Sequence, residues 1–272
     1  MIQRIIPSSG EKLPVIGLGT WQTFDTSDKN KHIQLTEVLM EMQKSGAKLI
    51  DSSPMYGKSE KVIGDLTPSI DKNNDFFYAT KVWTTGLKSG IEEMEKSMRL
   101  MQRESIDLMQ IHNLRDWKTH IKTLREWKEM GKIKYIGITH YTDSMHDDLE
   151  KIIKSEKIDF VQFNYSIENR NAEKSLFAIA EENGVATLIN RPFGEGHLFK
   201  KVRGKALPEW AIENGIHNWS SFFLKYIISN SAVTCVIPAT SNPLHATDNF
   251  DAGNSIVDEN LKEKMVNYLA HL

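Results

Sequence analysis

A short unit that repeats along the chain is the feature that most constrains its fold. Each copy is the end of a helical pattern, then a glycine, then an apolar strand-like run: EMQKSGAKLID, EWKEMGKIKYIGIT and AEENGVATLIN. Glycine suits the left-handed position just past a helix C-terminus, and we expect Gly46, Gly131 and Gly184 to occupy it. A helix that leads into a strand through a short loop, repeated, predicts βα units and a parallel sheet.

Strand-like runs alternate with helical patterns over the whole chain. There are eight, at residues 15–19, 49–53, 76–82, 107–112, 134–139, 160–165, 185–190 and 234–240. Several are apolar nearly throughout, which is typical of strands buried on both faces. Because no linker divides them, we predict one α/β domain over residues 1–272, a (β/α)8 TIM barrel. A doubly wound open sheet is the alternative, although no GxGxxG follows the first run as in a Rossmann domain.

Composition limits the classes of function. The formal net charge of the 272 residues is −2, which argues against nucleic acid as the main partner because phosphate binding needs a basic face. The one cysteine, Cys235, excludes an internal disulfide. No run has signal-peptide character or the roughly 20 apolar residues of a membrane span. We therefore expect a cytoplasmic protein without a membrane partner.

Four polar residues lie where predicted strands end, which is where barrel enzymes place their active sites. Asp51 and Tyr56 follow the second run, Lys81 lies near the end of the third and His112 ends the fourth. Each alone has a common structural role, since strand lysines are often ion-paired and histidines are often hydrogen-bonded in cores. Together, at neighbouring strand ends, they predict a catalytic site.

These residue types suit the protonation of a carbonyl oxygen. A phenol, with a pKa of about 10, becomes a better acid beside an ammonium group. A carboxylate keeps a buried ammonium charged, and a neutral imidazole can donate a hydrogen bond that orients a carbonyl. Reduction of a carbonyl by hydride needs such a proton donor and a nicotinamide cofactor.

The ordered motifs of the chain resemble those of the aldo-keto reductase superfamily over nearly its whole length. The matching segments are GLGTW, IDSSPMYGKSE, ATKVW, DLMQIHN, VQFNYS and IPATSNPLHATDN. The resemblance implies a (β/α)8 barrel with an N-terminal β-hairpin cap. It also implies NAD(P)H-dependent reduction of an aldehyde or ketone to an alcohol, with NADP(H) as the cofactor and a small-molecule carbonyl as the substrate.

The resemblance implies a role for each matching residue. Tyr56 would be the general acid, tuned by Lys81 and Asp51, and His112 would position the carbonyl. The cofactor would meet Gly19, Thr20, Asp51, Thr139, His140, Gln162, Arg191, Pro192, Phe193, Thr240, Ser241 and Asn249. The substrate would meet Trp21, Phe24, Trp83 and His112, although core packing explains Phe24 equally well. No metal site is expected.

Some positions depart from the family pattern. His140 replaces a common asparagine, and Arg191 stands near the place of a tyrosine that stacks on the nicotinamide. Ala239 and His245 replace the two cations that commonly recognise the 2′-phosphate of NADP. We therefore expect use of NADP(H) with dual specificity that includes NAD(H). The chain after the last strand is short, which suggests an open site and broad carbonyl specificity.

Two other classes of function stay open from the residues. A lyase or aldolase could form a Schiff base on Lys81. A cofactor-binding sensor or regulatory subunit could use the same barrel without catalysis, because a fold alone does not determine function. For either class, and for the reductase, we expect a monomer or weak homo-oligomer.

Overall fold

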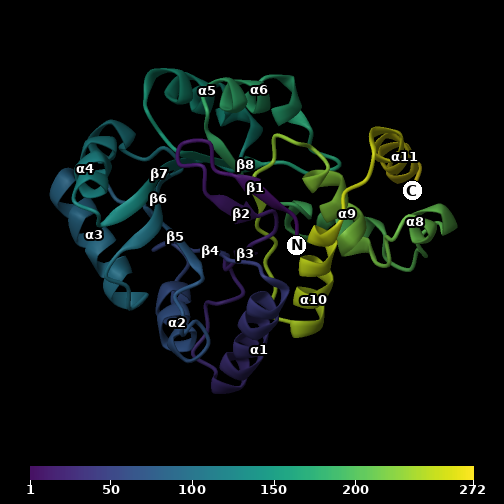
Figure 1. Cartoon of the computed structure of the whole chain (residues 1–272), viewed down its shortest axis with the longest axis horizontal. Helices are drawn as coiled ribbons and strands as arrows, with labels where there is room; N and C mark the ends of the chain where they lie inside the picture. Colours follow the sequence, from purple (N-terminus) through teal and green to yellow (C-terminus); the bar gives the residue numbers. More distant parts are fainter.

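The computed structural model describes residues 1–272 and contains a ring of parallel strands surrounded by helices (Figure 1). The eight strands run in the order β3 to β10, each hydrogen-bonded to the next. Bridges from Ile16 to Val236 and from Gly19 to Ala239 join the last strand to the first. The sheet is therefore a closed (β/α)8 barrel, and the open doubly wound sheet is excluded.

The barrel strands match the eight predicted runs. They are β3 (Leu18–Gly19), β4 (Leu49–Asp51), β5 (Phe77–Val82), β6 (Ile106–His112), β7 (Ile133–Thr139), β8 (Phe160–Asn164), β9 (Ala186–Asn190) and β10 (Cys235–Val236). The last run was predicted to continue to residue 240, but β10 ends two residues before Pro238. Proline has no N–H to donate to a neighbouring strand, which is one reason that the ladder stops there.

Helices cover the outside of the barrel, and none is both long and apolar enough to cross a bilayer. They are α1 (Lys29–Ser45), α2 (Ser59–Leu66), α3 (Leu87–Leu100), α4 (Trp117–Glu129), α5 (His146–Ser155), α6 (Leu176–Glu182), α7 (His197–Lys201), α8 (Glu209–Glu213), α9 (Trp219–Ile228), α10 (Pro243–Asp251) and α11 (Glu259–Ala270). Gly46, Gly131 and Gly184 have φ values of 78°, 72° and 65°. The prediction that these glycines end helices in the left-handed conformation is confirmed.

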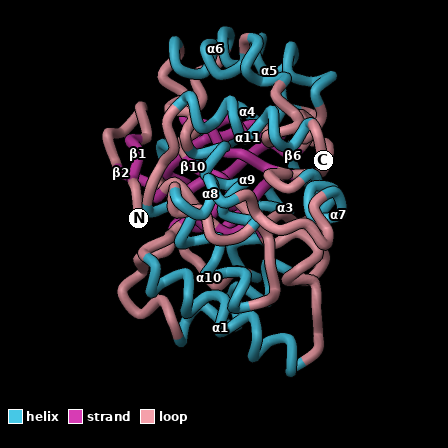
Figure 2. The backbone as a smooth tube through the Cα atoms, turned by 90° about the vertical axis from the view of Figure 1, so that its right-hand side faces the viewer, coloured by secondary structure: helices cyan, strands magenta, loops and turns pink.

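The predicted N-terminal hairpin is present and closes one end of the barrel. Strands β1 (Gln3–Ile5) and β2 (Lys12–Pro14) pair antiparallel, and Figure 2 shows them at the end opposite α7. Ile6 and Leu13 of the hairpin join an apolar cluster inside the barrel. The other members of this cluster are Leu49, Phe77, Ala79, Leu108, Tyr135, Phe160, Ala186, Leu188, Cys235 and Ile237. One end of the barrel is thus filled with apolar side chains.

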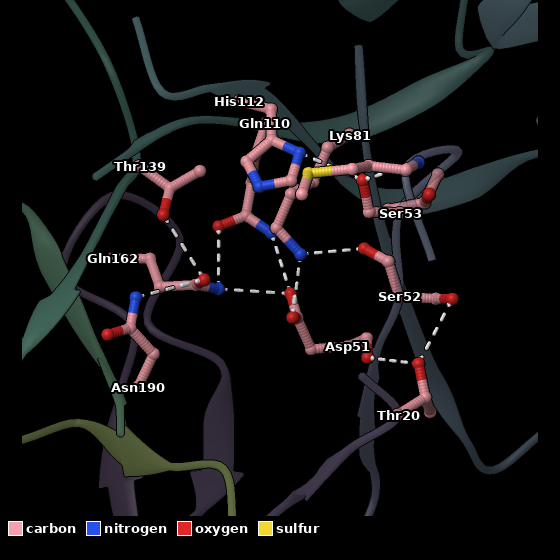
Figure 3. A network of polar contacts seen from close by, with 12 residues as sticks. Thr20, Asp51, Ser52, Ser53, Lys81, Gln110, His112, Thr139, Gln162 and Asn190 are labelled. Atoms are coloured by element: carbon pink, nitrogen blue, oxygen red, sulfur yellow. Dashed lines mark hydrogen bonds and ion pairs between the residues drawn. The ribbon is translucent and has the colours of Figure 1, made fainter. Parts of the chain in front are cut away.

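The alternation of side chains along each strand determines what occupies the other end. Successive strand residues face opposite sides, so residues two apart share a face. Inward positions that begin with Leu108 continue with Gln110 and His112, and those that include Ala79 continue with Lys81. Above the apolar layer lies a polar one, made of Asp51, Lys81, Gln110, His112, Thr139, Gln162 and Asn190 (Figure 3). This polar layer is the candidate site.

Candidate active site

Asp51 and Lys81 form a buried ion pair at the centre of the polar layer. The Lys81 side chain is 0% exposed, and its Nζ lies 2.7 Å from Asp51 Oδ2 and 2.6 Å from the carbonyl oxygen of Ser52. Burial acts to lower the pKa of Lys81, but the interactions with Asp51 and, after it, with Tyr56 outweigh burial, and the pKa is raised. Lys81 is therefore held as an ammonium ion where water cannot screen its charge.

The second carboxylate oxygen of Asp51 is also fully engaged. Asp51 Oδ1 accepts hydrogen bonds from Gln110 Nε2 at 2.9 Å and from Gln162 Nε2 at 3.0 Å (Figure 3). Gln162 Oε1 in turn accepts from Thr139 Oγ1 at 3.1 Å and from Asn190 Nδ2 at 3.4 Å. These contacts fix the carboxylate in one orientation, so the ammonium that it holds is fixed too.

Tyr56 lies beside this ion pair. Its ring centre is 4.9 Å from Lys81 Nζ, and its side chain is partly exposed, in contrast to the buried pair. Burial raises the pKa of Tyr56, and the opposing positive charge of Lys81 only partly offsets this. The contribution of Lys81 to the Tyr56 pKa has the expected direction, while burial makes the net shift upward. The phenol stays protonated and is available as a proton donor.

His112 is a neutral hydrogen-bond donor in this site. Burial, together with the positive charge of Lys81, lowers its pKa from 6.5 to about 2. Ser53 Oγ accepts from the Met55 N–H at 3.2 Å and lies 2.9 Å from His112 Nδ1. The Ser53 hydroxyl hydrogen can then be donated to Nδ1, which leaves the ring proton of the neutral imidazole on Nε2. Ser53 and Gln110 were not predicted from the sequence. Ser53 lies in the same loop as Tyr56, and Gln110 lies on the same face of β6 as His112.

Aromatic rings surround the space next to these groups. The His112 ring centre lies 5.8 Å from that of Tyr56 and 6.3 Å from that of Trp83. Trp21 is 39% exposed, as expected for a ring at an opening, but Phe24 is 0% exposed and packs in the core between barrel and helices. The structure therefore corrects the placement of Phe24 at the substrate mouth and favours the core-packing alternative.

Two buried side-chain oxygens lack hydrogen-bond partners at positions that were predicted to meet or adjoin the cofactor. Asn190 Oδ1 and Asn249 Oδ1 are buried oxygens without a hydrogen-bond donor in the chain. A buried polar atom without a partner costs about 1–3 kcal/mol, so both suit a ligand that carries N–H donors. A nicotinamide–adenine dinucleotide has amide and amino donors at its two ends. The residues present thus fit that cofactor.

The other predicted cofactor residues divide into two groups. Thr240 and Ser241 directly precede α10, whose N-cap is Asn242, and Gly19 lies so close to the Ile237 carbonyl that a Cβ would be 2.8 Å from it. Thr20 is hydrogen-bonded to the backbone of Asp51. All of these lie around the carboxyl ends of β3, β4 and β10.

The segment after β9 makes contacts of its own. Arg191 pairs with Glu195 at 2.8 Å and stacks over Tyr141 at 4.2 Å. Phe193 packs on Phe199, with ring centres 4.8 Å apart, while Pro192 is buried. The connection that follows contains the short helices α7 and α8. The segment after β9 is therefore held in place by contacts within the chain itself.

The His140 imidazole, at the end of β7, is also oriented by a neighbour. Its Nδ1 accepts from the Thr142 N–H at 3.3 Å, and burial lowers its pKa. The neutral ring then presents Nε2–H as a donor. An imidazole with a free Nε2–H can donate a hydrogen bond, as the amide of an asparagine does.

Known proteins resemble this chain over most of its length. A model described as the Aldo/keto reductase family matches residues 15–271. The aldo-keto reductase YhdN of Bacillus subtilis is 26% identical over 227 residues, which span 76% of this chain and 66% of that protein. Methylglyoxal reductase YeaE of Escherichia coli is 24% identical over 262 residues, 92% of this chain and 89% of that protein.

Solved structures share the fold. An aldo/keto reductase from Klebsiella pneumoniae, determined in complex with NADP and acetate, superimposes with a TM-score of 0.84. The two sequences are 17% identical, and the match covers 99% of this chain and 96% of that one.

Proposed function

The chain belongs to the aldo/keto reductase family, and from that membership we propose that Tyr56 is the acid with which it protonates a carbonyl. The chain is an NAD(P)H-dependent oxidoreductase that reduces an aldehyde or ketone to an alcohol. The observation that carries the proposal is the fully buried Lys81–Asp51 pair, with its ammonium 4.9 Å from the Tyr56 ring centre.

Each group in the site has a distinct part in the reaction. His112 donates its Nε2–H to the carbonyl oxygen and so orients the carbonyl. When bound, the cofactor supplies the hydride that makes this oxygen basic. Tyr56 gives its proton to the oxygen, and Lys81 stabilises the phenolate that is left. Asp51 keeps Lys81 charged and in place.

The raised pKa of Tyr56 is compatible with this role. In the free protein the phenol keeps its proton because burial disfavours the phenolate. The proton leaves only when a stronger base, the developing alkoxide, lies within hydrogen-bond distance. A donor that stays protonated until that moment suits reduction at neutral pH.

We propose that the cofactor is held by the residues around the carboxyl ends of β3, β4, β7, β8, β9 and β10. Thr139, His140, Gln162 and Asn190 would hold the nicotinamide carboxamide, and Thr240, Ser241 and Asn249 the adenosine. NADP(H) is the expected cofactor. Because Ala239 and His245 carry no fixed positive charge, NAD(H) should bind too. Fluorescence titration with both reduced cofactors measures the preference. Tighter binding of NADH than of NADPH would overturn the expected preference for NADP(H).

The main test compares the native chain with Tyr56→Phe. NADPH oxidation with 4-nitrobenzaldehyde should fall about 100- to 10,000-fold in the variant, while NADPH binding stays unchanged because only one hydroxyl is lost. Tyr268→Phe, on the remote helix α11, removes the same hydroxyl elsewhere and should leave turnover unchanged. Equal turnover in Tyr56→Phe and the native chain would show that the proton donor is another group.

The alternative functions make different predictions. A native chain that binds NADPH but reduces no aldehyde would favour the sensor. A Schiff base on Lys81 needs a neutral amine, and the raised pKa of Lys81 opposes that state; covalent trapping of a substrate by borohydride would nevertheless establish it. We further expect the protein to be cytoplasmic. We also expect a monomer or weak homo-oligomer, and size-exclusion chromatography tests this oligomeric state.

A further inference from the structure

Arg115 is linked to the proposed catalytic centre through the ring of Trp83, which lies between the guanidinium and His112. It follows His112 by three residues in the loop from β6 to α4. Its guanidinium carbon is 5.2 Å from the ring centre of Trp83, and that ring centre is 6.3 Å from the ring centre of His112. Trp83 thus forms a wall that runs from the imidazole to the guanidinium.

The loop holds the guanidinium in one orientation. Arg115 Nε donates to Thr85 Oγ1 at 3.2 Å, and its backbone N–H donates to the carbonyl of His112 at 3.1 Å. Asp116, the next residue, accepts from the Gly86 N–H at 2.7 Å and from Thr119 Oγ1 at 2.8 Å. The loops after β5 and β6 are therefore held together by hydrogen bonds. Because the Arg115 side chain is already ordered, it would lose little conformational entropy when a ligand binds.

The charge of Arg115 has no acidic partner within the chain, in contrast to the charges of Arg125 and Arg191. Arg125 and Arg191 pair with glutamates within 2.8 Å or less, but no carboxylate lies within 4.0 Å of Arg115. The nearby Asp116 is engaged as described, and Glu93 accepts from the Trp83 and Thr84 N–H groups. The two terminal nitrogens of Arg115 make no hydrogen bond within the chain.

A planar guanidinium with free terminal nitrogens matches the geometry of a carboxylate, which it can bind through two parallel hydrogen bonds. We propose that Arg115 selects aldehydes or ketones that carry a carboxylate. The carbonyl would lie at Tyr56 and His112, the body of the substrate along Trp83, and the carboxylate on Arg115. This inference rests on the proposed function, because it places the carbonyl at that site.

The test compares 4-carboxybenzaldehyde with its methyl ester, in which a methyl group removes the negative charge. We expect the native chain to have the higher kcat/KM for the acid, and Arg115→Met to lower the acid-to-ester ratio of kcat/KM about 10- to 100-fold. The loss should appear mainly in KM for the acid. Arg115→Lys, which keeps the charge without the planar fork, should retain part of the ratio, and added salt should reduce it in the native chain.

Arg103→Met is the matched control. Arg103 also stacks on an aromatic ring, that of Tyr78 at 4.3 Å, but near the amino ends of the strands, away from the site. Arg103→Met should leave kcat/KM unchanged for both substrates. An acid-to-ester ratio unchanged by Arg115→Met would overturn the inference while leaving the reductase function intact. A native chain that reduces neither aldehyde would overturn the proposed function, and the inference with it.

Discussion

The ion pair of Asp51 and Lys81 is a structural risk as well as a catalytic device. Both side chains are almost completely buried, so removing one partner leaves a buried charge without compensation. We expect Asp51→Asn to lower the free energy of unfolding by about 3–5 kcal/mol, as measured by urea denaturation. Asp65→Asn is the control, because Asp65 also lies 2.7 Å from a lysine, Lys61, but at the surface. The control should lose about 0–1 kcal/mol; equal losses would contradict the argument.

His112 makes stability depend on pH in a defined direction. Burial lowers its pKa from 6.5 to about 2, so between these values the unfolded chain binds a proton that the folded chain does not. Its contribution is complete above pH 6.5 and is lost progressively as the pH falls toward 2. We expect His112→Gln to flatten the decline of unfolding free energy between pH 6.5 and pH 4. Curves of the same slope for both proteins would argue that His112 is not buried as described.

At the residue scale the sequence identified the groups that carry charge or a proton. Asp51, Tyr56, Lys81 and His112 were predicted because their side chains follow strands whose ends converge. Ser53 was not, because a serine in a polar loop carries no signal of the imidazole that it will meet. The net pKa shift of Tyr56 was also beyond the sequence, since it depends on how much water the folded loops exclude.

At the element scale, strands were predictable because burial on both faces makes them apolar throughout. Their lengths were less so: the runs at 15–19 and 234–240 form ladders of only two residues each. Pairing distances, which the sequence does not reveal, decide where a ladder ends. The short helices α7 and α8 were missed because five residues are too few to show a helical period.

Gly64 in α2 shows how closely two elements pack. A Cβ at this position would lie 2.1 Å from the Leu100 carbonyl oxygen at the end of α3. In an exposed helix, alanine would stabilise by about 1 kcal/mol relative to glycine, but here we expect Gly64→Ala to destabilise by about 1–3 kcal/mol. Urea denaturation measures the sign, and a gain in stability would show that the helices can separate without penalty.

At the scale of the whole molecule, the order of motifs along the chain predicted both the closed barrel and its cap. The cap is held by Arg4, which donates to the carbonyls of Ile228, the last residue of α9, and of Asn230 and Val233 just after it. We expect Arg4→Met to lower the free energy of unfolding by about 2–4 kcal/mol, because hydrogen bonds to a charged group contribute about 1.5–3 kcal/mol each. Lys88→Met, at a side chain that is 91% exposed, is the control and should have little effect. A loss in Arg4→Met no larger than in that control would mean that the hairpin is held by its apolar residues alone.

The apolar filling beneath the hairpin also determines how substrate and product enter and leave the site. Since Ile6 and Leu13 seal one end of the barrel, everything that reaches the polar layer enters and leaves through the same doorway. An alcohol that has just formed must therefore leave through this opening before the next aldehyde can enter. Because the barrel has one open end, release of the product and binding of the next substrate share one route, and this exchange limits turnover.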